Sequence, residues 1–318
     1  MPTLSIGTLW ACPRCHAELH VSTPGKKSVR FPLKVASRTV HVSASLEQYD
    51  DTCSTCGLPF TATSDDRFIY PYRQLLASIN LQRFLKWSSA QNNGFISYSF
   101  MRGSSCSIEG RDDVSKFAGF IREHVRVAPE VVLDLGCGPL ARPAYLPPFK
   151  DAVLIGVDPF DSEWDGPFIQ GVGEFLPLKD ESVDLGVAAT ALDHTLDTKM
   201  ALQEFARVIR QGGNLVVWDH TFEARWKRPA GVLYGLLNPR ISLREKVARF
   251  RSGVLPERVR IYDSGVVLWT PKGYADPFHE PQSRRSSWSR RLRKAIEASG
   301  FTLESEDRVN GFTCYVRN

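Results

Sequence analysis

The 318-residue sequence lacks any run of about 18 consecutive apolar residues, the length that a helix needs to cross a bilayer. Its first residues also lack the charged start and apolar block that mark a secretory signal peptide. These absences argue against a membrane-spanning or secreted protein, and we expect a cytoplasmic one. The apolar fraction of 42% is typical of a globular chain with enough side chains for a hydrophobic core.

A strong overall charge is missing as well, because the formal net charge is only +5. The basic excess lies in the last third of the chain, above all in RRSSWSRRLRK at residues 284–294. This segment predicts a helix with a solvated basic face and with Trp288, Leu292 and Ile296 turned inward. The alternative is a surface that binds phosphate, nucleic acid or a phosphorylated sugar carrier.

The most informative segment is VVLDLGCGP at residues 131–139, which is followed by GVDP at residues 156–159. An apolar run that leads into Gly-x-Gly predicts a buried strand and a turn at which the backbone can approach a ligand closely. Asp158, the acid at the end of the next predicted strand, suits a ribose diol. The third glycine of a dinucleotide-binding motif is missing, since Leu140 and Arg142 follow the turn instead.

The rest of the chain alternates between strand and helix patterns. Apolar runs predict strands at 168–172, 183–189 and 215–218, and helical spacing predicts a helix over 200–210 that stops at Gly212-Gly213. A helix at about 286–299 and strands at 301–307 and 312–316, the last one antiparallel, would close the chain. The alternation predicts an α/β fold with helices on both faces of a mostly parallel sheet.

Four of the seven cysteines form two C-x-x-C pairs near the N-terminus, Cys12 with Cys15 and Cys53 with Cys56. Two such pairs can hold one tetrahedral Zn²⁺, and a closed site of four thiolates would be structural. The alternatives are two disulfides, which a cytosolic setting disfavours, and a redox pair, which needs only one C-x-x-C. Three nearby histidines could each replace a cysteine ligand: His16, His20 and His41.

Between the two pairs, alternation at 28–33 and 39–42 predicts a hairpin, and further along the chain 258–270 predicts another. Helices are expected at 71–91 and 112–125.

The segments LDLGCGP, GVDP, GEFLPLKDESVD, LDH and EFARVIRQGGNLVV together resemble the class I S-adenosylmethionine-dependent methyltransferases of the type 11-like group. The resemblance covers residues 110–220 in detail and implies a Rossmann-like domain with a mostly parallel seven-stranded sheet and an antiparallel last strand. The N-terminal module resembles the small zinc ribbons, including the Trm112-like type, that precede some bacterial methyltransferase domains. A nicotinamide-binding Rossmann domain is the alternative.

The resemblance implies S-adenosyl-L-methionine as cofactor, beside a structural Zn²⁺. Asp134 and the turn Gly136-Cys137-Gly138 would hold its amino-acid end and sugar, Asp158 would accept bonds from the ribose hydroxyls, and Pro159 would flank the adenine. The sequence departs from the family at Val172, where an acid is common, and at Leu140, where a small residue is usual. The further candidates for cofactor contact are Gly173, Glu174 and Phe175 beside the base, Thr190, and Arg102 (or Tyr98) at the methionine carboxylate.

Methyl transfer from a sulfonium is an in-line displacement, so the protein needs chiefly to align the acceptor, and a hydroxyl acceptor also needs a base. Three histidines are candidates for that base: His194 after the fourth predicted strand, His220 after the fifth, and His279 ahead of the last helix. Each could instead be a hydrogen-bonded structural histidine.

We expect a zinc-ribbon module at 1–66, a helical connector and cofactor cap at 67–127, and a methyltransferase domain at 128–318. An aromatic-rich insertion at 221–283 is the candidate acceptor site, because open α/β sheets bind ligands at the carboxyl ends of their strands.

The favoured function is O-methylation of a sugar or another small biosynthetic intermediate. One alternative is an rRNA or tRNA methyltransferase that grips its substrate with the zinc module and the basic last third. Another is a non-catalytic cofactor-binding scaffold. No Asn-Pro-Pro-aromatic tetrad follows the fourth predicted strand, which disfavours amino-group methylation of the adenine type.

Overall fold

The computed structural model of the chain describes residues 6–19, 30–35, 38–43, 50–63, 66–88, 91, 112–139, 142–146, 149, 152–219, 258–261, 267–270, 288–308 and 310–318. Among these residues, no helix is both long enough and apolar enough to cross a membrane.

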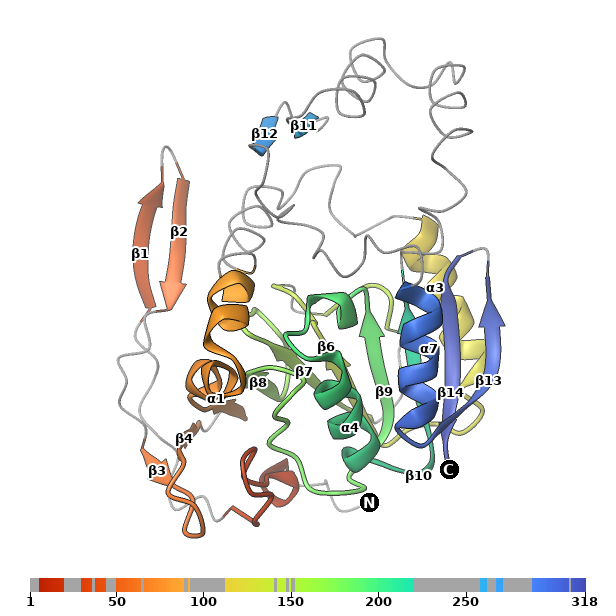
Figure 1. Ribbon diagram of the computed structural model, residues 1–318, viewed down its shortest axis with the longest axis horizontal. Coiled ribbons are helices and arrows are strands. Elements are labelled where there is room, and N and C mark those ends of the chain that lie inside the picture. Colours follow the sequence, from red (N-terminus) through yellow and green to blue (C-terminus); the bar gives the residue numbers. More distant parts are fainter. Residues whose placement is uncertain are drawn as a thin grey trace.

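The centre of the molecule is a ten-stranded sheet in the order β13-β14-β10-β9-β6-β7-β8-β5-β4-β3 (Figure 1). Its first seven strands form the predicted methyltransferase-like sheet: β6, β7, β8, β9 and β10 pair in parallel, and β14 lies antiparallel between β10 and β13. The bounds are β6 Val131–Leu135, β7 Val153–Asp158, β8 Phe168–Gln170, β9 Val183–Ala189, β10 Ile209–Trp218, β13 Phe301–Asp307 and β14 Phe312–Arg317.

Helices cover both faces of this sheet, as the alternating pattern predicts (Figure 1). Both faces of β6 are apolar and buried: Val131, Leu133 and Leu135 belong to one hydrophobic cluster, and Val132 belongs to a second. The covering helices of the first cluster are α1 (Tyr72–Ile79), α4 (Thr198–Val208) and α7 (Trp288–Ala298), and that of the second is α3 (Asp112–His124).

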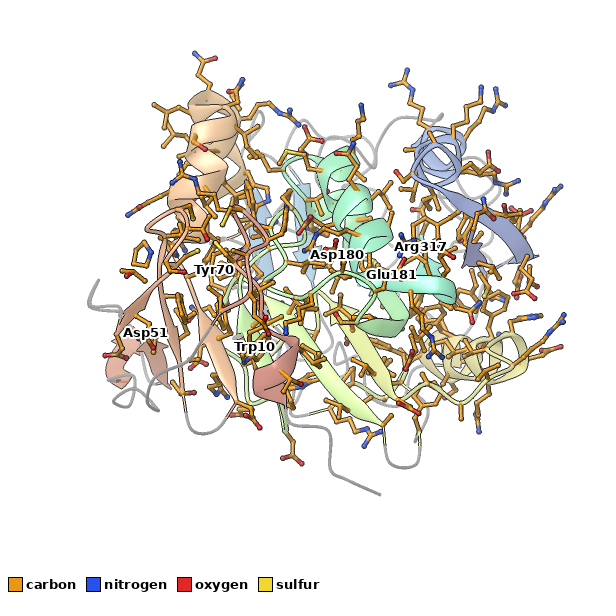
Figure 2. The ribbon with its side chains drawn as sticks, turned by 90° about the horizontal axis from the view of Figure 1, so that it is seen from below. Trp10, Asp51, Tyr70, Asp180, Glu181 and Arg317 are labelled. Carbon is orange, nitrogen blue, oxygen red and sulfur yellow. The ribbon has the colours of Figure 1, made fainter. Side chains whose placement is uncertain are left out.

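Three short strands from the N-terminal part extend the sheet beyond the predicted seven. β5 (Arg67–Ile69) pairs in parallel with β8, β4 (Pro59–Ala62) pairs antiparallel with β5, and β3 (Asp51–Thr52) pairs antiparallel with β4. Strands of two to four residues show too little alternation to be recognised in a sequence. One sheet thus runs through both the cysteine-bearing module and the methyltransferase-like part. In Figure 2, Asp51 of β3 lies at the left and Arg317 of β14 lies right of centre.

The prediction of one helix over 71–91 is wrong. α1 ends at Ile79, Asn80 is extended with φ −162° and ψ 105°, and helical residues resume at 81–88. The Asn80 side-chain oxygen accepts a hydrogen bond from the backbone amide of Arg83 at 3.0 Å, so Asn80 caps the second helix instead of continuing the first.

The two predicted hairpins are confirmed. β1 (Arg30–Val35) pairs antiparallel with β2 (Arg38–Ser43), and β11 (Arg258–Ile261) pairs antiparallel with β12 (Val267–Thr270). β10 begins at Ile209 and not at the predicted residue 215. The Gly212-Gly213 segment belongs to the strand, where the pairing with β9 is irregular between Ile209 and Asn214.

The last helix confirms the predicted packing at two of its three inward positions. Leu292 and Ile296 of α7 are buried, while Arg290, Arg291 and Lys294 are exposed. The side chain of Trp288 lies outside the described residues. Within the described residues 290–296, the helix therefore has a solvated basic face and an apolar inner side.

Candidate cofactor site and metal centre

The turn after β6 brings the backbone close to two neighbouring strand ends. Gly136 and Gly138 have φ values of +73° and +72°, a conformation that favours glycine. The Gly136 amide donates to the Val157 carbonyl of β7 at 2.8 Å, and a Cβ on Gly136 would lie only 2.6 Å from the Cβ of Ala191, just beyond β9. Cys137, between the glycines, is buried. The turn needs Gly136 for both its conformation and its space.

Asp158, at the carboxyl end of β7, is tied to that turn. Its Oδ2 accepts from the Gly138 amide at 3.1 Å, and its Oδ1 accepts from the Phe160 amide at 2.9 Å. Burial raises the pKa of Asp158 to about 6, with the two amides acting in the opposite direction. Each carboxylate oxygen keeps a further lone pair, which is what two ribose hydroxyls would need.

Asp134, at the end of β6, holds a buried oxygen with no partner. Its side chain is fully buried, Oδ2 accepts from the Tyr145 hydroxyl at 2.9 Å, and Oδ1 is the one buried side-chain polar atom of the described residues without a hydrogen bond. Burial raises the pKa of Asp134 well above its ordinary value. An unsatisfied buried carboxylate oxygen is costly, so this atom fits a site completed by a donor such as the ammonium of S-adenosylmethionine.

Thr190 directly follows β9 and has a left-handed conformation with φ +55°. This conformation is unusual for a β-branched residue, and the Thr190 amide holds it by donating to the Trp218 carbonyl of β10 at 2.9 Å. Strained backbone of this kind concentrates at functional sites. Thr190 directly precedes Ala191, which packs on Gly136, so the end of β9 borders the same turn.

The segment Gly173–Phe175, which follows β8, contacts both β6 and the residue ahead of α4. Gly173 packs against Leu135, since a Cβ there would lie 2.9 Å from Leu135 Cδ2. Glu174 is buried, and its Oε1 accepts from the Asp197 amide at 2.9 Å, just ahead of α4. Burial raises the pKa of Glu174 to about 7. Gly173 and Glu174 thus have packing and capping contacts of their own, and half-buried Phe175 follows them.

His194 lies in a short 3₁₀ helix after β9, Leu192–His194. Its Nε2 is 3.8 Å from Asp193 Oδ1, and its side chain is 31% exposed, so the ring is accessible. His194 acts electrostatically on the pKa of both Asp158 and Asp193, while burial is the main cause that raises the pKa of Asp193. The carboxyl ends of β7 and β9 therefore bring Asp158, Asp193 and His194 to one edge of the sheet.

Five candidate site residues lie outside the described part of the chain: His20, Tyr98, Arg102, His220 and His279. Most of the aromatic-rich insertion at 221–283 lies outside it as well.

Two residues that sequence reasoning missed support the site. Tyr145 donates to Asp134, and the Ser162 hydroxyl donates to the Gly138 carbonyl at 2.6 Å. Neither residue belongs to a motif, and the partners lie 11 and 24 residues apart along the chain. No pattern in the sequence indicates these contacts.

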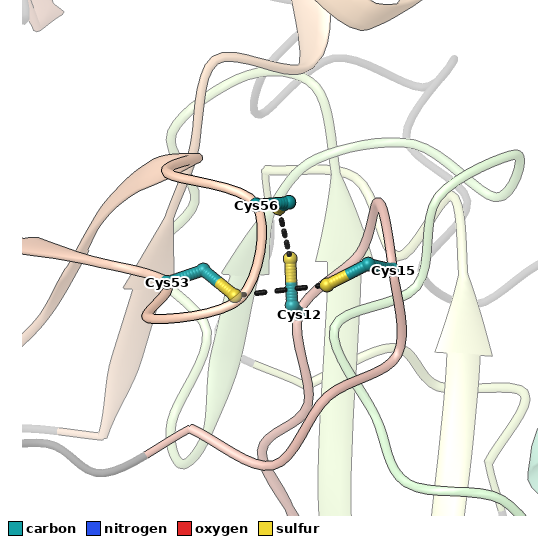
Figure 3. Close-up of side chains that lie close together, drawn as sticks. All are labelled: Cys12, Cys15, Cys53 and Cys56. Atoms are coloured by element: carbon teal, nitrogen blue, oxygen red, sulfur yellow. Dashed lines mark hydrogen bonds between the residues drawn. The ribbon is translucent and has the colours of Figure 1, made fainter.

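The four N-terminal cysteines form one cluster (Figure 3). The Sγ atoms of Cys12 and Cys56 lie 3.5 Å apart, those of Cys15 and Cys53 lie 3.6 Å apart, and all four thiols lie within 4.8 Å of one another and are free. A tetrahedral site with Zn–S bonds of about 2.3 Å separates its sulfurs by about 3.8 Å. The cluster therefore fits a four-thiolate zinc centre.

The two C-x-x-C segments have the same backbone geometry. The Cys12 carbonyl accepts from the His16 amide at 2.8 Å, and the Cys53 carbonyl accepts from the Gly57 amide at 2.8 Å. His16 and Gly57 both have positive φ, at 58° and 70°, so His16 occupies a turn position beside the cluster. Although burial opposes it, the backbone amides of Cys56 and Thr55 lower the pKa of Cys53 to about 7, whereas burial raises the pKa of Cys12 and of Cys15.

Comparison with known proteins identifies the domain. Residues 133–217 match a methyltransferase domain family. An uncharacterized methyltransferase, YcgJ of Bacillus subtilis, is 40% identical over 53 residues, which are 17% of this chain and 21% of that protein. The O-methyltransferase cnsE of Penicillium expansum is 33% identical over 112 residues, 30% of this chain and 41% of that protein.

Among solved structures, the chain is similar to the 1,6-didemethyltoxoflavin-N1-methyltransferase of Burkholderia thailandensis, which has S-adenosylhomocysteine bound. The identity is 11% and the TM-score is 0.40, with 85% of this chain and 98% of that chain covered.

The matched segments span 21% and 41% of the two sequence relatives, less than half of either. Residues 133–217 thus match a methyltransferase domain family, and the strand order and the glycine turn around them are those of a Rossmann-like, mostly parallel sheet.

Proposed function

We propose that the protein is an S-adenosylmethionine-dependent methyltransferase that methylates a hydroxyl group of a sugar or another small biosynthetic intermediate. The observation that carries the proposal is the unpartnered, fully buried Oδ1 of Asp134 beside the Gly136–Gly138 turn, within a matched methyltransferase domain. The similarity to an O-methyltransferase supports a hydroxyl acceptor.

In this proposal Asp134 accepts from the cofactor's ammonium, and Asp158 accepts from the ribose hydroxyls. Bound S-adenosylmethionine supplies a methyl group on a sulfonium, which is already activated for displacement. The accessible ring of His194, with Asp193 3.8 Å away, takes the proton that the acceptor hydroxyl releases. The four N-terminal cysteines hold a structural Zn²⁺, because a closed four-thiolate site leaves no open position for chemistry.

The first experiment measures binding of S-adenosylmethionine and S-adenosylhomocysteine by calorimetry, with the zinc content determined on the same sample. We expect micromolar binding and one zinc per chain. Absence of binding to well-folded, metal-replete protein would overturn the proposal. Candidate acceptors then follow, and a steep loss of acceptor binding between low and physiological salt would indicate RNA in place of a small hydroxylated substrate.

The role of His194 is tested by His194→Ala once an acceptor is known. Loss of a general base lowers kcat by roughly 10²- to 10⁴-fold, and the Kd for S-adenosylmethionine should stay within about twofold. A weaker Kd with unchanged kcat would instead indicate that the histidine is a packing residue next to Asp158.

A further inference from the structure

The segment Arg67–Tyr72, which leads from β5 into α1, touches both loops that border the proposed nucleoside end of the cofactor. One loop follows Asp158 of β7, and the other follows β8 up to Phe175. Three side chains of the segment, those of Arg67, Tyr70 and Tyr72, make polar contacts with these loops.

Tyr70 forms hydrogen bonds with the backbone of the loop after β8. Its hydroxyl donates to the Phe175 carbonyl at 2.5 Å and accepts from the Val172 amide at 3.2 Å. The ring leaves no room for a side chain at Gly171, where a Cβ would lie 2.5 Å from it. Gly171 in turn donates to the Asp158 carbonyl at 3.0 Å, so the same loop is joined to the proposed ribose site.

Arg67 and Tyr72 hold the loop after β7. The Tyr72 hydroxyl donates to the Pro159 carbonyl at 2.6 Å, next to Asp158. The Arg67 guanidinium pairs with Asp161 at 2.8 Å and donates to the Ser162 carbonyl at 2.9 Å. Ser162 itself donates to Gly138 in the glycine turn, so these contacts continue to the end of β6.

The cysteine cluster is packed onto the same segment. Trp10, two residues before Cys12, lies with its ring centroid 5.0 Å from that of Phe68 in β5, and Phe60 of β4 stacks on Phe68 at 5.3 Å. Trp10 also bridges to Leu178, just beyond the loop that Tyr70 holds. Figure 2 shows Trp10 and Tyr70 on the same part of the sheet.

We propose that Tyr70 and Tyr72 are positioning residues for cofactor binding, through which the N-terminal module fixes the two loops around the nucleoside. This inference rests on the proposed function. The hydroxyls, not the rings, carry the effect, because phenylalanine would fill the same space but leave the carbonyls of Phe175 and Pro159 without these donors. Burial, with Glu174 nearby, raises the pKa of Tyr70 well above its usual value, so the donor stays protonated.

The test uses the full-length, zinc-loaded protein and the variants Tyr70→Phe, Tyr72→Phe and the double variant. The matched control is Tyr315→Phe, which removes a buried phenol from β14, far along the sheet from β5 and β8. Three quantities are measured: the Kd for S-adenosylhomocysteine, the inhibition constant of adenosine as a competitor, and the hydrogen-exchange rate of the Val172 amide.

We expect Tyr70→Phe to weaken both ligands about tenfold and Tyr72→Phe about fivefold, since each hydroxyl contributes one or two hydrogen bonds. The loss should be equal for the two ligands, because the loops act on the nucleoside that both share. The Val172 amide should exchange faster in Tyr70→Phe. Tyr315→Phe should leave both constants unchanged, even if its melting temperature falls.

Unchanged constants in the folded double variant would overturn the positioning role while leaving the proposed function intact. A loss for S-adenosylhomocysteine without a matching loss for adenosine would also contradict it. If the wild-type protein binds neither ligand, the proposed function itself fails and the positioning role fails with it.

Discussion

Asp134 and Asp184 are two carboxylates of the central sheet that differ in their hydrogen bonding. Asp184 Oδ2 accepts from the Glu130 and Val131 amides at 2.7 and 2.8 Å, so it fastens the start of β6. Asp134, at the other end of β6, is fully buried and leaves Oδ1 without a donor. A group that costs folding free energy without a partner in the protein is best explained by a bound ligand.

Asp134→Asn should therefore weaken S-adenosylmethionine binding tenfold or more. The unliganded protein should become no less stable, because Asn keeps an acceptor for the Tyr145 hydroxyl and removes a carboxyl whose charged form burial disfavours. Asp184→Asn serves as the control and should show the opposite pattern, a loss of stability with unchanged affinity. Calorimetric binding and denaturant unfolding of both variants measure this. A large stability loss in Asp134→Asn with unchanged affinity would assign Asp134 a folding role.

Gly136 and Gly212 allow the cost of a positive φ to be distinguished from the cost of a steric clash. Both have a positive φ, +73° and +74°. A Cβ added to Gly136 would lie 2.6 Å from the Cβ of Ala191, whereas a Cβ added to Gly212 would have no neighbour within 4 Å. We expect Gly212→Ala to cost about 1 kcal/mol of unfolding free energy from strain alone. Gly136→Ala should cost at least about 2 kcal/mol and abolish cofactor binding. Equal costs in the two variants would contradict this assignment.

At the scale of elements, the N-terminal module is part of the main core. Cys12, Cys53, Leu58 and Phe60 belong to the same buried cluster as strand residues of the methyltransferase domain, such as Leu133. Strands β3, β4 and β5 continue the central sheet. The module therefore stabilises the domain through packing that the two share.

Removal of zinc by a chelator should lower the melting temperature by at least about 5 °C, in a single transition, because one core connects the module and the domain. Calorimetric scans of metal-replete and chelated protein measure this, with Cys53→Ser expected to reproduce the chelated state. Cys314→Ala, a buried cysteine of β14 outside the cluster, should retain full zinc content. A separate early transition, with the main one unmoved, would show two independent units.

At the scale of the whole molecule, buried carboxylates make stability depend on pH. Burial raises the pKa of Glu174 from its ordinary value of 4.5 to about 7 and that of Asp158 from 3.8 to about 6. Between the unfolded and folded pKa values, the folded state binds more protons than the unfolded state. The unliganded protein therefore loses stability as pH rises through this window.

We expect the unfolding free energy of the unliganded protein to fall from pH 4.5 to 7, with Glu174 contributing roughly 2–3 kcal/mol. Glu174→Gln keeps a carbonyl oxygen for the Asp197 amide and should flatten this part of the profile. Denaturant unfolding at several pH values measures it. Cofactor affinity should change in the opposite direction, rising through about pH 6 as Asp158 ionises. A profile for Glu174→Gln that parallels the wild type would contradict the role of Glu174.

The sequence by itself determined the elements whose signals are local. Apolar runs located the strands of the parallel sheet, Gly136 and Gly138 marked the turn, Asp158 marked the end of β7, and the cysteine spacing predicted the cluster. It failed where a single side chain overrode the pattern, as at Asn80, whose cap divides the predicted helix.

Only the tertiary structure decided which distant segments meet. β5 pairs with β8 about a hundred residues later, and Tyr70 reaches Val172 and Phe175 over the same separation. Tyr145 reaches Asp134 across the glycine turn and leaves one oxygen without a donor. Periodicity reports which face of an element is buried, but hydrogen bonds between loops depend on how the packed core places them, and no local pattern encodes that placement.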